Sequence, residues 1–255
     1  MLLACDIGNT NITLGVFQGE HLQATWRVAT DPRHQPDEYV ALLSSLLPLK
    51  DVSASDITQA TLCSVVPTLT HIFEELCRSY FRVDPLVVTT GVKTGVKIFY
   101  DNPRDVGADR IADAAAAFHL YGGPVIIVDF GTATVFDAIS QEGDYLGGAI
   151  VPGINIAADA LYMNTSQLRR VELVKPDTAI GKSTVHSLQS GLVMGYISLV
   201  EGMVTRFREE LGGQCPVIAT GGLAELIAQD DTLFNHINPD LTLVGLRLIY
   251  EMNKS

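Results

Sequence analysis

Two short segments of the chain combine a carboxylate, a glycine two residues later and a run of small polar side chains. They are Asp6–Asn11 and Asp129–Thr134. Glycine lets a phosphate group approach the backbone, whose N–H groups can then bind the phosphate oxygens. The carboxylate can hold Mg²⁺, directly or through water, where the metal bridges two phosphates. Either segment alone could be a plain hairpin turn, but the two copies favour a site that binds the phosphates of a nucleotide.

A third glycine segment, Thr220-Gly221-Gly222, stands between an apolar run and a predicted helix. Glycines at this place would let the chain pass close to an adenine or a ribose, and the N-terminus of a helix favours negative charge. Ligand pockets concentrate at interfaces between domains. We therefore expect this segment to complete a nucleotide site together with the two carboxylate turns.

Asp109 is the candidate general base. It lies in the first turn of a predicted helix and next to Arg110, and both features keep a carboxylate ionised and able to accept a proton. A carboxylate within hydrogen-bond reach of an acceptor hydroxyl can orient and deprotonate it. Asp105 and Asp113 lie one turn to either side and are rival bases, and Asp109 could also serve only to stabilise the helix. The sequence alone does not rank the three.

The elements that must position these residues repeat along the chain. An apolar run that ends in a carboxylate opens each half, at 2–5 and at 125–128, and each run is followed by two further predicted strands with a glycine turn. Matched strands in the same order indicate a duplicated α/β domain. We place the two domains at residues 1–118 and 119–255.

Helical patterns fill the space between these strands. An amphipathic stretch after Pro67 and an alanine-rich stretch from Gly107 to Leu120 predict two helices. A longer helix is predicted near Val185–Leu211. It contains glycines at which it could break or flex, namely Gly191, Gly195 and Gly202.

Other matches to known motifs fail. Gly181-Lys182-Ser183 resembles the end of a P-loop, but Pro176 stands where that motif requires a glycine. Asp129-Phe130-Gly131 resembles the metal-binding motif of protein kinases, yet no catalytic-loop motif precedes it. The 6 histidines show no spacing that suits a metal site.

The charge and hydropathy of the chain exclude several classes of partner. The formal net charge is −12, which disfavours nucleic acid and repels anionic membranes. No stretch approaches the roughly 18–20 uninterrupted apolar residues of a membrane span, and the first apolar run is too short for a signal peptide. The 4 cysteines are scattered and read as buried thiols in a reducing compartment. We expect a cytoplasmic protein that binds neither nucleic acid nor membranes.

Taken together, the motifs resemble those of one family, type III pantothenate kinase, within the acetate and sugar kinase/Hsp70/actin superfamily. They span nearly the whole chain in the family's order, and the combination is specific although each piece alone is weak. The motifs that carry the resemblance are Asp6–Thr13, Tyr100-x-Asn102-Pro103, Gly107-Ala108-Asp109-Arg110, Asp129–Thr134, Gly147-Gly148-x-Ile150-x-Pro152-Gly153, Gly181-Lys182-Ser183-Thr184 and Gly221-Gly222.

The resemblance implies a fold and an activity. The fold would be two ribonuclease H-like (actin-like ATPase) domains, each a mixed five-stranded sheet with flanking helices. The activity would be the ATP-dependent phosphorylation of pantothenate to 4'-phosphopantothenate, the first step of coenzyme A biosynthesis. The resemblance also implies ATP with Mg²⁺, a monovalent cation (K⁺ or NH₄⁺) and a homodimer.

The resemblance further implies a role for each matching residue. Asp109 would be the base, Asp129 would hold the monovalent cation, and Asp6 would hold Mg²⁺, directly or through water. The residues implied to contact ATP are Asp6, Ile7, Gly8, Asn9, Thr10, Asn11, Ile12, Thr13 and Thr132. Those implied to bind pantothenate are Tyr100, Gly107, Ala108, Asp109, Arg110 and Thr184.

Two other functions stay open on the residues alone. The first is another small-molecule kinase of the same superfamily, with a sugar or an acyl carboxylate as the acceptor. The second is a nucleotide-binding accessory protein that has lost catalysis, although the intact Asp6, Asp109, Arg110 and Asp129 disfavour it.

Overall fold

The computed structural model describes residues 1–228 and 233–254. The chain divides into two compact units. Unit 1 comprises Met1–His119 together with the C-terminal segment from Leu241, and unit 2 comprises Leu120–Asp240. In the part of the chain that the structure describes, no helix is both long enough and apolar enough to cross a membrane.

Unit 1 contains a mixed five-stranded sheet with the strand order β3-β2-β1-β4-β5. Strands β1, β2 and β3 form an antiparallel meander, and β4 and β5 continue the sheet in parallel to β1. The strands are β1 (Leu2–Ile7), β2 (Asn11–Gln18), β3 (His21–Ala29), β4 (Gln59–Ser64) and β5 (Leu86–Val87). The helices are α1 (Pro36–Leu46), α2 (Pro67–Leu76), α3 (Ala108–Tyr121) and α8 (Leu241–Asn253).

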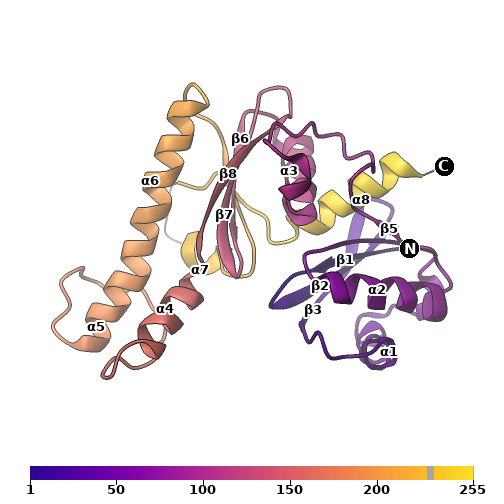
Figure 1. Ribbon diagram of the computed structural model, residues 1–255, viewed down its shortest axis with the longest axis horizontal. Helices are drawn as coiled ribbons and strands as arrows, with labels where there is room; N and C mark the ends of the chain where they lie inside the picture. Colours follow the sequence, from indigo (N-terminus) through magenta and orange to yellow (C-terminus); the bar gives the residue numbers. More distant parts are fainter. Residues whose placement is uncertain (229–232, 255) are drawn as a thin grey trace. The chain divides into compact units, whose positions relative to one another are not determined.

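Alternation along the strands gives this sheet two apolar faces, because successive side chains point to opposite sides. One face carries Cys5, Leu14 and Trp26 and packs against α1 and α2. The other face carries Ala4 and Cys63 and packs against α3 and α8. Figure 1 shows the sheet of unit 1 with helices on both sides.

The C-terminal helix corrects the predicted domain boundaries. The sequence predicts that residues 119–255 form the second domain, but α8 belongs to unit 1. Its apolar side chains Leu243, Leu246 and Ile249 cover the sheet face that holds Ala4. An amphipathic pattern shows that a helix has an apolar face, but not which of two sheets the face covers.

Unit 2 repeats the sheet of unit 1. Its strand order is β10-β9-β6-β7-β8, with the same antiparallel meander and two parallel additions, which confirms the predicted duplication. The strands are β6 (Val125–Phe130), β7 (Ala133–Ile139), β8 (Tyr145–Pro152), β9 (Val217–Thr220) and β10 (His236–Ile237). The helices are α4 (Ile154–Met163), α5 (Thr184–Gln189), α6 (Gly195–Glu210) and α7 (Ala224–Ala228).

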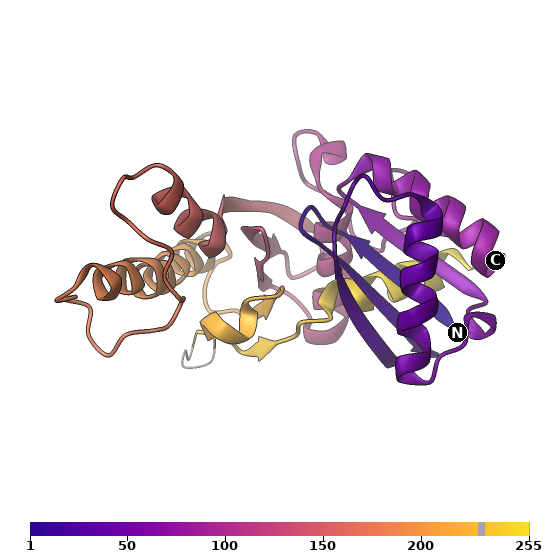
Figure 2. The ribbon, with the colours of Figure 1, turned by 90° about the horizontal axis from the view of Figure 1, so that it is seen from below.

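The predicted long helix is present as α5 and α6 joined by a π-helical turn. That turn covers Ser190–Met194 and contains Gly191, one of the glycines at which the sequence predicts a flexed helix. Tyr196 and Val200 of α6 pack against the apolar face of β6, beside Ile154 of α4. Figure 2 shows α4 alongside this helix.

Shorter helical turns complete unit 1. They are the 3-10 turns Leu47–Lys50, Ala54–Asp56 and Pro103–Asp105, and the π turn Cys77–Phe81 after α2. The last 3-10 turn lies in the long connection from β5 to α3, which also carries Tyr100.

Candidate active site

The turn between β1 and β2 is the first glycine segment of the sequence. The Gly8 N–H donates to the Asn11 carbonyl oxygen at 3.0 Å, and a Cβ on Gly8 would lie 3.0 Å from that oxygen. Thr30 at the end of β3 ties the turn down, since its hydroxyl donates to the Gly8 carbonyl at 2.7 Å. Asn9 and Thr10 are exposed. The turn is therefore both tight and open to a ligand.

The neighbouring strand residues contribute unequally. Ile7 and Ile12 are fully buried in the core of unit 1, so only their backbone can reach a ligand. Asp6 and Thr13 are register partners on β1 and β2 and are partly exposed. Asn11 is exposed at the start of β2.

Asp6 lies in a cluster of polar groups on the α3 side of the sheet. Its register partner on β4 is Cys63, whose thiol donates to Asp6 Oδ1 with a sulfur-to-oxygen distance of 3.4 Å. Burial raises the pKa of the Cys63 thiol, which keeps it protonated and able to donate. Burial and the negative charge of Asp109 raise the pKa of Asp6 to about 7, against the smaller opposing effects of Cys63 and Arg27. Asp6 and Asp109 are thus electrostatic neighbours within unit 1.

Asp109 stands at the N-terminus of α3. Its Oδ1 accepts the backbone N–H of Arg110 at 2.8 Å, and a Cβ on Gly107 would lie only 2.3 Å from the same oxygen. A side chain at position 107 would therefore displace the Asp109 carboxylate from this position. Ala108, Asp109 and Arg110 are all partly exposed.

The rival carboxylates lie in different surroundings. Asp105 is exposed in a 3-10 turn, where Asn102 donates to it at 2.7 Å. Asp113 is 3% exposed on α3. Of the three, Asp109 is the carboxylate whose charge raises the pKa of Asp6. Burial makes Asp113 a poor partner for a substrate, and Asp105 does not share the Asp6 cluster.

In unit 2 the turn between β6 and β7 is the counterpart of the first turn. The Gly131 N–H donates to the Ala133 carbonyl at 3.0 Å, and Thr132 is exposed at the tip. The Gly153 N–H donates to the Thr132 carbonyl at 3.2 Å, and a Cβ on Gly153 would lie 2.3 Å from that oxygen. The β8 end therefore approaches the turn so closely that only glycine fits.

Asp129 meets the third glycine segment. It pairs in register with Thr220 of β9, and a Cβ on Gly221 would lie 2.2 Å from Asp129 Oδ1. Gly221 also has a φ of +87°, a left-handed conformation that favours glycine. The structure thus brings Asp129, Thr132 and Gly221 to one end of the unit 2 sheet, as the sequence predicts.

Tyr196 of α6 contacts β7 and β8 beside the turn in unit 2, and it belongs to none of the sequence motifs. Its hydroxyl is hydrogen-bonded to the Thr134 hydroxyl and donates to the Pro152 carbonyl at 3.4 Å. One side chain of α6 thereby holds the start of β7 and the end of β8. The only signal in the sequence is a tyrosine in a helix, which by itself indicates packing.

Thr184 and Tyr100 lie on other elements than these clusters. Thr184 is exposed at the first position of α5, after the cap Ser183, whose Oγ accepts the His186 N–H at 3.2 Å. Tyr100 is 37% exposed in the connection before α3. Thr184 lies in unit 2, whereas Tyr100 and the Gly107–Arg110 segment lie in unit 1.

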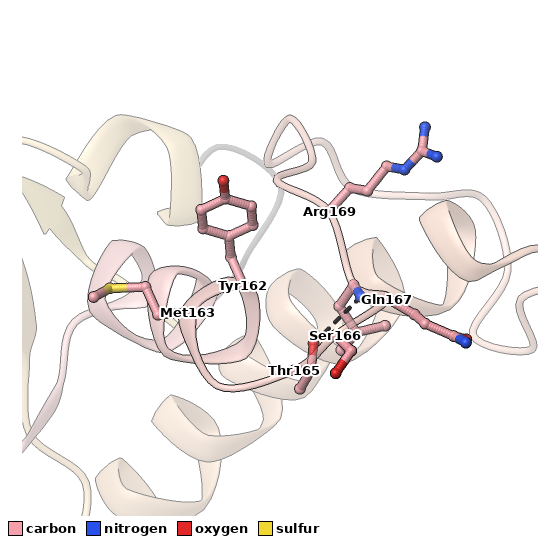
Figure 3. Close-up of a pocket in the computed structure, with 7 residues that line it drawn as sticks. Tyr162, Met163, Thr165, Ser166, Gln167 and Arg169 are labelled. Carbon is pink, nitrogen blue, oxygen red and sulfur yellow. Dashed lines mark hydrogen bonds between the residues drawn. The ribbon is translucent and has the colours of Figure 1, made fainter.

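A separate open hollow of about 760 Å³ lies at the end of α4 and along the segment that follows it (Figure 3). Tyr162 and Arg169 line it, and the backbone N–H of Leu168 donates to the Thr165 hydroxyl at 3.3 Å. It contains none of the residues that the sequence singles out.

The oxygen donors in the two turns suit the cations that the resemblance implies. Asp6 supplies a carboxylate beside the first turn in unit 1, the ligand type that Mg²⁺ prefers. In unit 2 the Asp129 carboxylate lies in a space that a Cβ on Gly221 would fill.

Comparison with solved structures shows the fold. A putative Baf family transcriptional activator from Campylobacter jejuni superposes with a TM-score of 0.61 and 21% identity over 98% of each chain. The activator of 2-hydroxyisocaproyl-CoA dehydratase from Clostridium difficile, with bound ADPNP, gives 0.53 and 13% identity over 99% of this chain and 97% of that one. An inorganic polyphosphate/ATP-glucomannokinase from an Arthrobacter strain gives 0.50 and 15% over 99% and 98%. The predicted actin-like ATPase fold is confirmed.

Sequence comparison shows the family. The model for type III pantothenate kinase matches residues 2–206. A type III pantothenate kinase of Roseiflexus sp. (strain RS-1) is 54% identical over 255 residues and covers all of both chains. One from Dehalococcoides mccartyi (strain CBDB1) is 52% identical over 253 residues, covering 99% of this chain and 96% of its own. With its motifs in order along two duplicated sheets, this chain belongs to the type III pantothenate kinase family.

Proposed function

We propose that this protein transfers the γ-phosphoryl group of ATP to the 4'-hydroxyl of pantothenate, giving 4'-phosphopantothenate and ADP. Membership of the family supports the acceptor and the ATP donor. The observation that carries the chemistry is the pair of Asp6 and Asp109. A carboxylate beside a glycine turn and a carboxylate at a helix N-terminus lie close enough for the charge of one to raise the pKa of the other.

Asp109 is the general base of the proposed reaction. It would accept the proton of the pantothenate hydroxyl as the oxygen attacks the γ-phosphorus, while ADP leaves. The carboxylate stands at the N-terminus of α3, and the backbone N–H of Arg110 fixes its orientation by donating to Oδ1. Its partial exposure leaves a face open to the substrate.

The turns bind ATP in this proposal. Asn9, Thr10, Asn11 and Thr13 at and beside the first turn and Thr132 of the second offer backbone N–H groups, hydroxyls and amides to phosphate oxygens. The Gly8 N–H already donates to the Asn11 carbonyl, so Gly8 contributes by letting a phosphate approach the backbone. Asp6 would hold Mg²⁺, which neutralises charge on the phosphates when bound. Ile7 and Ile12 take part only through their backbone.

Two further assignments belong to the proposal. Asp129 holds a monovalent cation, K⁺ or NH₄⁺, against the glycine backbone at Gly221. Tyr100, Gly107, Ala108, Arg110 and Thr184 contact pantothenate. Both assignments rest on the motif match.

The proposed assembly is a homodimer in the cytoplasm. Large apolar side chains are exposed along α4 and the α5–α6 helix, among them Met163 at 75%, Val185 at 51% and Ile156 at 45%. Exposed apolar surface of this kind is typical of interaction sites. Sedimentation that gave a monomer at micromolar concentration would contradict the dimer.

One assay tests the function as a whole. The purified protein is given ATP, Mg²⁺ and K⁺ with either pantothenate or a panel of sugars and acyl carboxylates, and ADP release is followed by a coupled reaction. We expect release with pantothenate and a marked drop when K⁺ is replaced by Na⁺. Transfer to a sugar would favour another kinase of the superfamily. ATP binding with no turnover on any acceptor would favour an accessory protein.

A further inference from the structure

Arg27 is a positively charged residue that lies outside the sequence motifs. It lies on β3, an edge strand of the unit 1 sheet, and it is exposed. Within residues 1–228 and 233–254, the structure gives its side chain no hydrogen bond and no ion pair. An exposed arginine whose side chain has no hydrogen bond or ion pair within the protein is available to a ligand.

The register places Arg27 in one row with the carboxylate of the first turn. Arg27 pairs with Thr13 on β2, and Thr13 pairs with Asp6 on β1. Directly paired residues lie on the same face of a sheet, and neighbouring strands are about 4.8 Å apart. Thr13 is therefore the one residue that separates Arg27 from Asp6, at two strand spacings or about 10 Å. Consistent with this placement, the charge of Arg27 lowers the pKa of Asp6, against the larger effects of burial and Asp109.

The same face carries hydrogen-bond donors toward the turn. Asn11 lies two residues before Thr13 on β2, and pairs with Ala29 two residues after Arg27. Residues two apart on a strand share a face. The amide of Asn11, the hydroxyl of Thr13 and the guanidinium of Arg27 therefore lie on one face, in this order from the turn. The opposite face, with Ile12 and Leu14, is buried in the core.

We propose that Arg27 binds a phosphate group of the nucleotide, above Thr13 and beside the turn at Gly8. This inference rests on the proposed function for the identity of the nucleotide. Guanidinium is the side-chain group best suited to phosphate, because its planar fork gives two parallel hydrogen bonds to two oxygens. It would also supply positive charge that the acidic first turn lacks.

The test compares binding of ATP with binding of adenosine. The variants are Arg27→Gln, which removes the charge, and Arg27→Lys, which keeps the charge but not the fork. Arg82→Gln is the matched control. Arg82 is exposed, and it follows α2 and the π turn, which lead away from the carboxyl end of β4. Equilibrium affinities are measured with Mg²⁺ present, together with thermal unfolding and the KM for each substrate.

We expect Arg27→Gln to weaken ATP binding and raise the KM for ATP by about 10- to 100-fold, the range of a charged hydrogen bond. Adenosine affinity, the KM for pantothenate and the unfolding temperature should stay as in the parent protein. Arg27→Lys should recover part of the loss, and Arg82→Gln should show none.

Three results of the variant comparison would overturn the inference. ATP affinity within twofold of the parent protein in Arg27→Gln would show that no phosphate contact is lost. Equal losses for ATP and adenosine would indicate a structural role, and a rise in the KM for pantothenate alone would move Arg27 to the acceptor. Failure of the proposed function gives a different result: the parent protein would bind ATP but would not phosphorylate pantothenate. The comparison of ATP and adenosine binding would still decide the role of Arg27 in that case. A parent protein that does not bind ATP would refute both.

Discussion

The Asp129 carboxylate and Gly221 touch so closely that no side chain can stand at position 221. A Cβ there would lie 2.2 Å from Asp129 Oδ1 and 2.7 Å from the backbone of Phe130. The contact joins the end of β6 to the segment after β9, two of the three glycine segments that the sequence marks. It explains why a glycine follows Thr220, and it fixes the side of the sheet on which the Asp129 carboxylate lies.

Gly221→Ala should therefore damage both the fold and the site. The φ of +87° costs an alanine about 1 kcal/mol, and the clash with Asp129 adds to it. Gly212→Ala is the control, because Gly212 has a φ of +84° and nothing within 4 Å of its Cβ position. We expect Gly221→Ala to lower turnover and the response to K⁺ well below those of Gly212→Ala. Equal effects of the two variants on turnover would show that the Asp129 contact has no functional weight.

Asp109→Asn should abolish turnover while nucleotide binding survives. An amide cannot accept the hydroxyl proton, and loss of a general base costs about 10²–10⁴-fold in rate. Asp105→Asn is the matched control, since Asp105 lies in the preceding turn and does not share the Asp6 cluster. The measurements are kcat with pantothenate and the affinity for ATP. Full activity of Asp109→Asn, or an equal loss in Asp105→Asn, would remove Asp109 as the base.

The raised pKa of Asp6 predicts a pH-dependent stability for the protein without metal. The ordinary value is 3.8 and the folded value is about 7, so the folded state binds the proton more tightly. Below pH 3.8 both states hold the proton and Asp6 contributes nothing. Between the two values the unfolded state ionises first, so stability falls as the pH rises, and above pH 7 the penalty is complete.

Asp6→Asn should remove this penalty. We expect the variant to be more stable than the parent protein above pH 7, by at most about 4 kcal/mol, and the gain should vanish towards pH 4. The measurement is urea unfolding in EDTA across this pH range. The same variant should lose its magnesium-dependent turnover. A stability gain that does not change with pH would contradict the raised pKa.

The sequence predicts the two turns well because their signals are local. An apolar strand, a carboxylate and a glycine two residues later are adjacent in the chain, and their repetition at Asp6 and Asp129 identifies the duplicated sheets. Gly107 and Asp109 are likewise near neighbours. Such features are determined locally, because the strand ends at the carboxylate and the glycine permits the tight turn that follows.

The features that the sequence reading missed depend on register and packing. Arg27 joins the Asp6 row only because the antiparallel pairing of β2 and β3 places it opposite Thr13. A shift of one residue would turn it to the other face. The position of α8 depends on which of two similar sheets packs better against its apolar face. Neither the hydrophobic pattern of α8 nor its place in the chain shows which sheet that is.

The packing of α8 on α3 yields the last prediction. A Cβ on Gly245 of α8 would lie 1.9 Å from the backbone oxygen of Ala112 on α3, so the two helices meet at a glycine. Gly245→Ala must push them apart, and overpacking of this kind costs about 1–3 kcal/mol. Because α3 carries Asp109, the variant should also lower kcat.

Gly195→Ala is the control. It stands in α6 with nothing within 4 Å of its Cβ position, and there alanine should stabilise the helix by up to about 1 kcal/mol. Denaturant unfolding of both variants should give shifts of opposite sign, and a stabilised Gly245→Ala would refute this contact between α3 and α8.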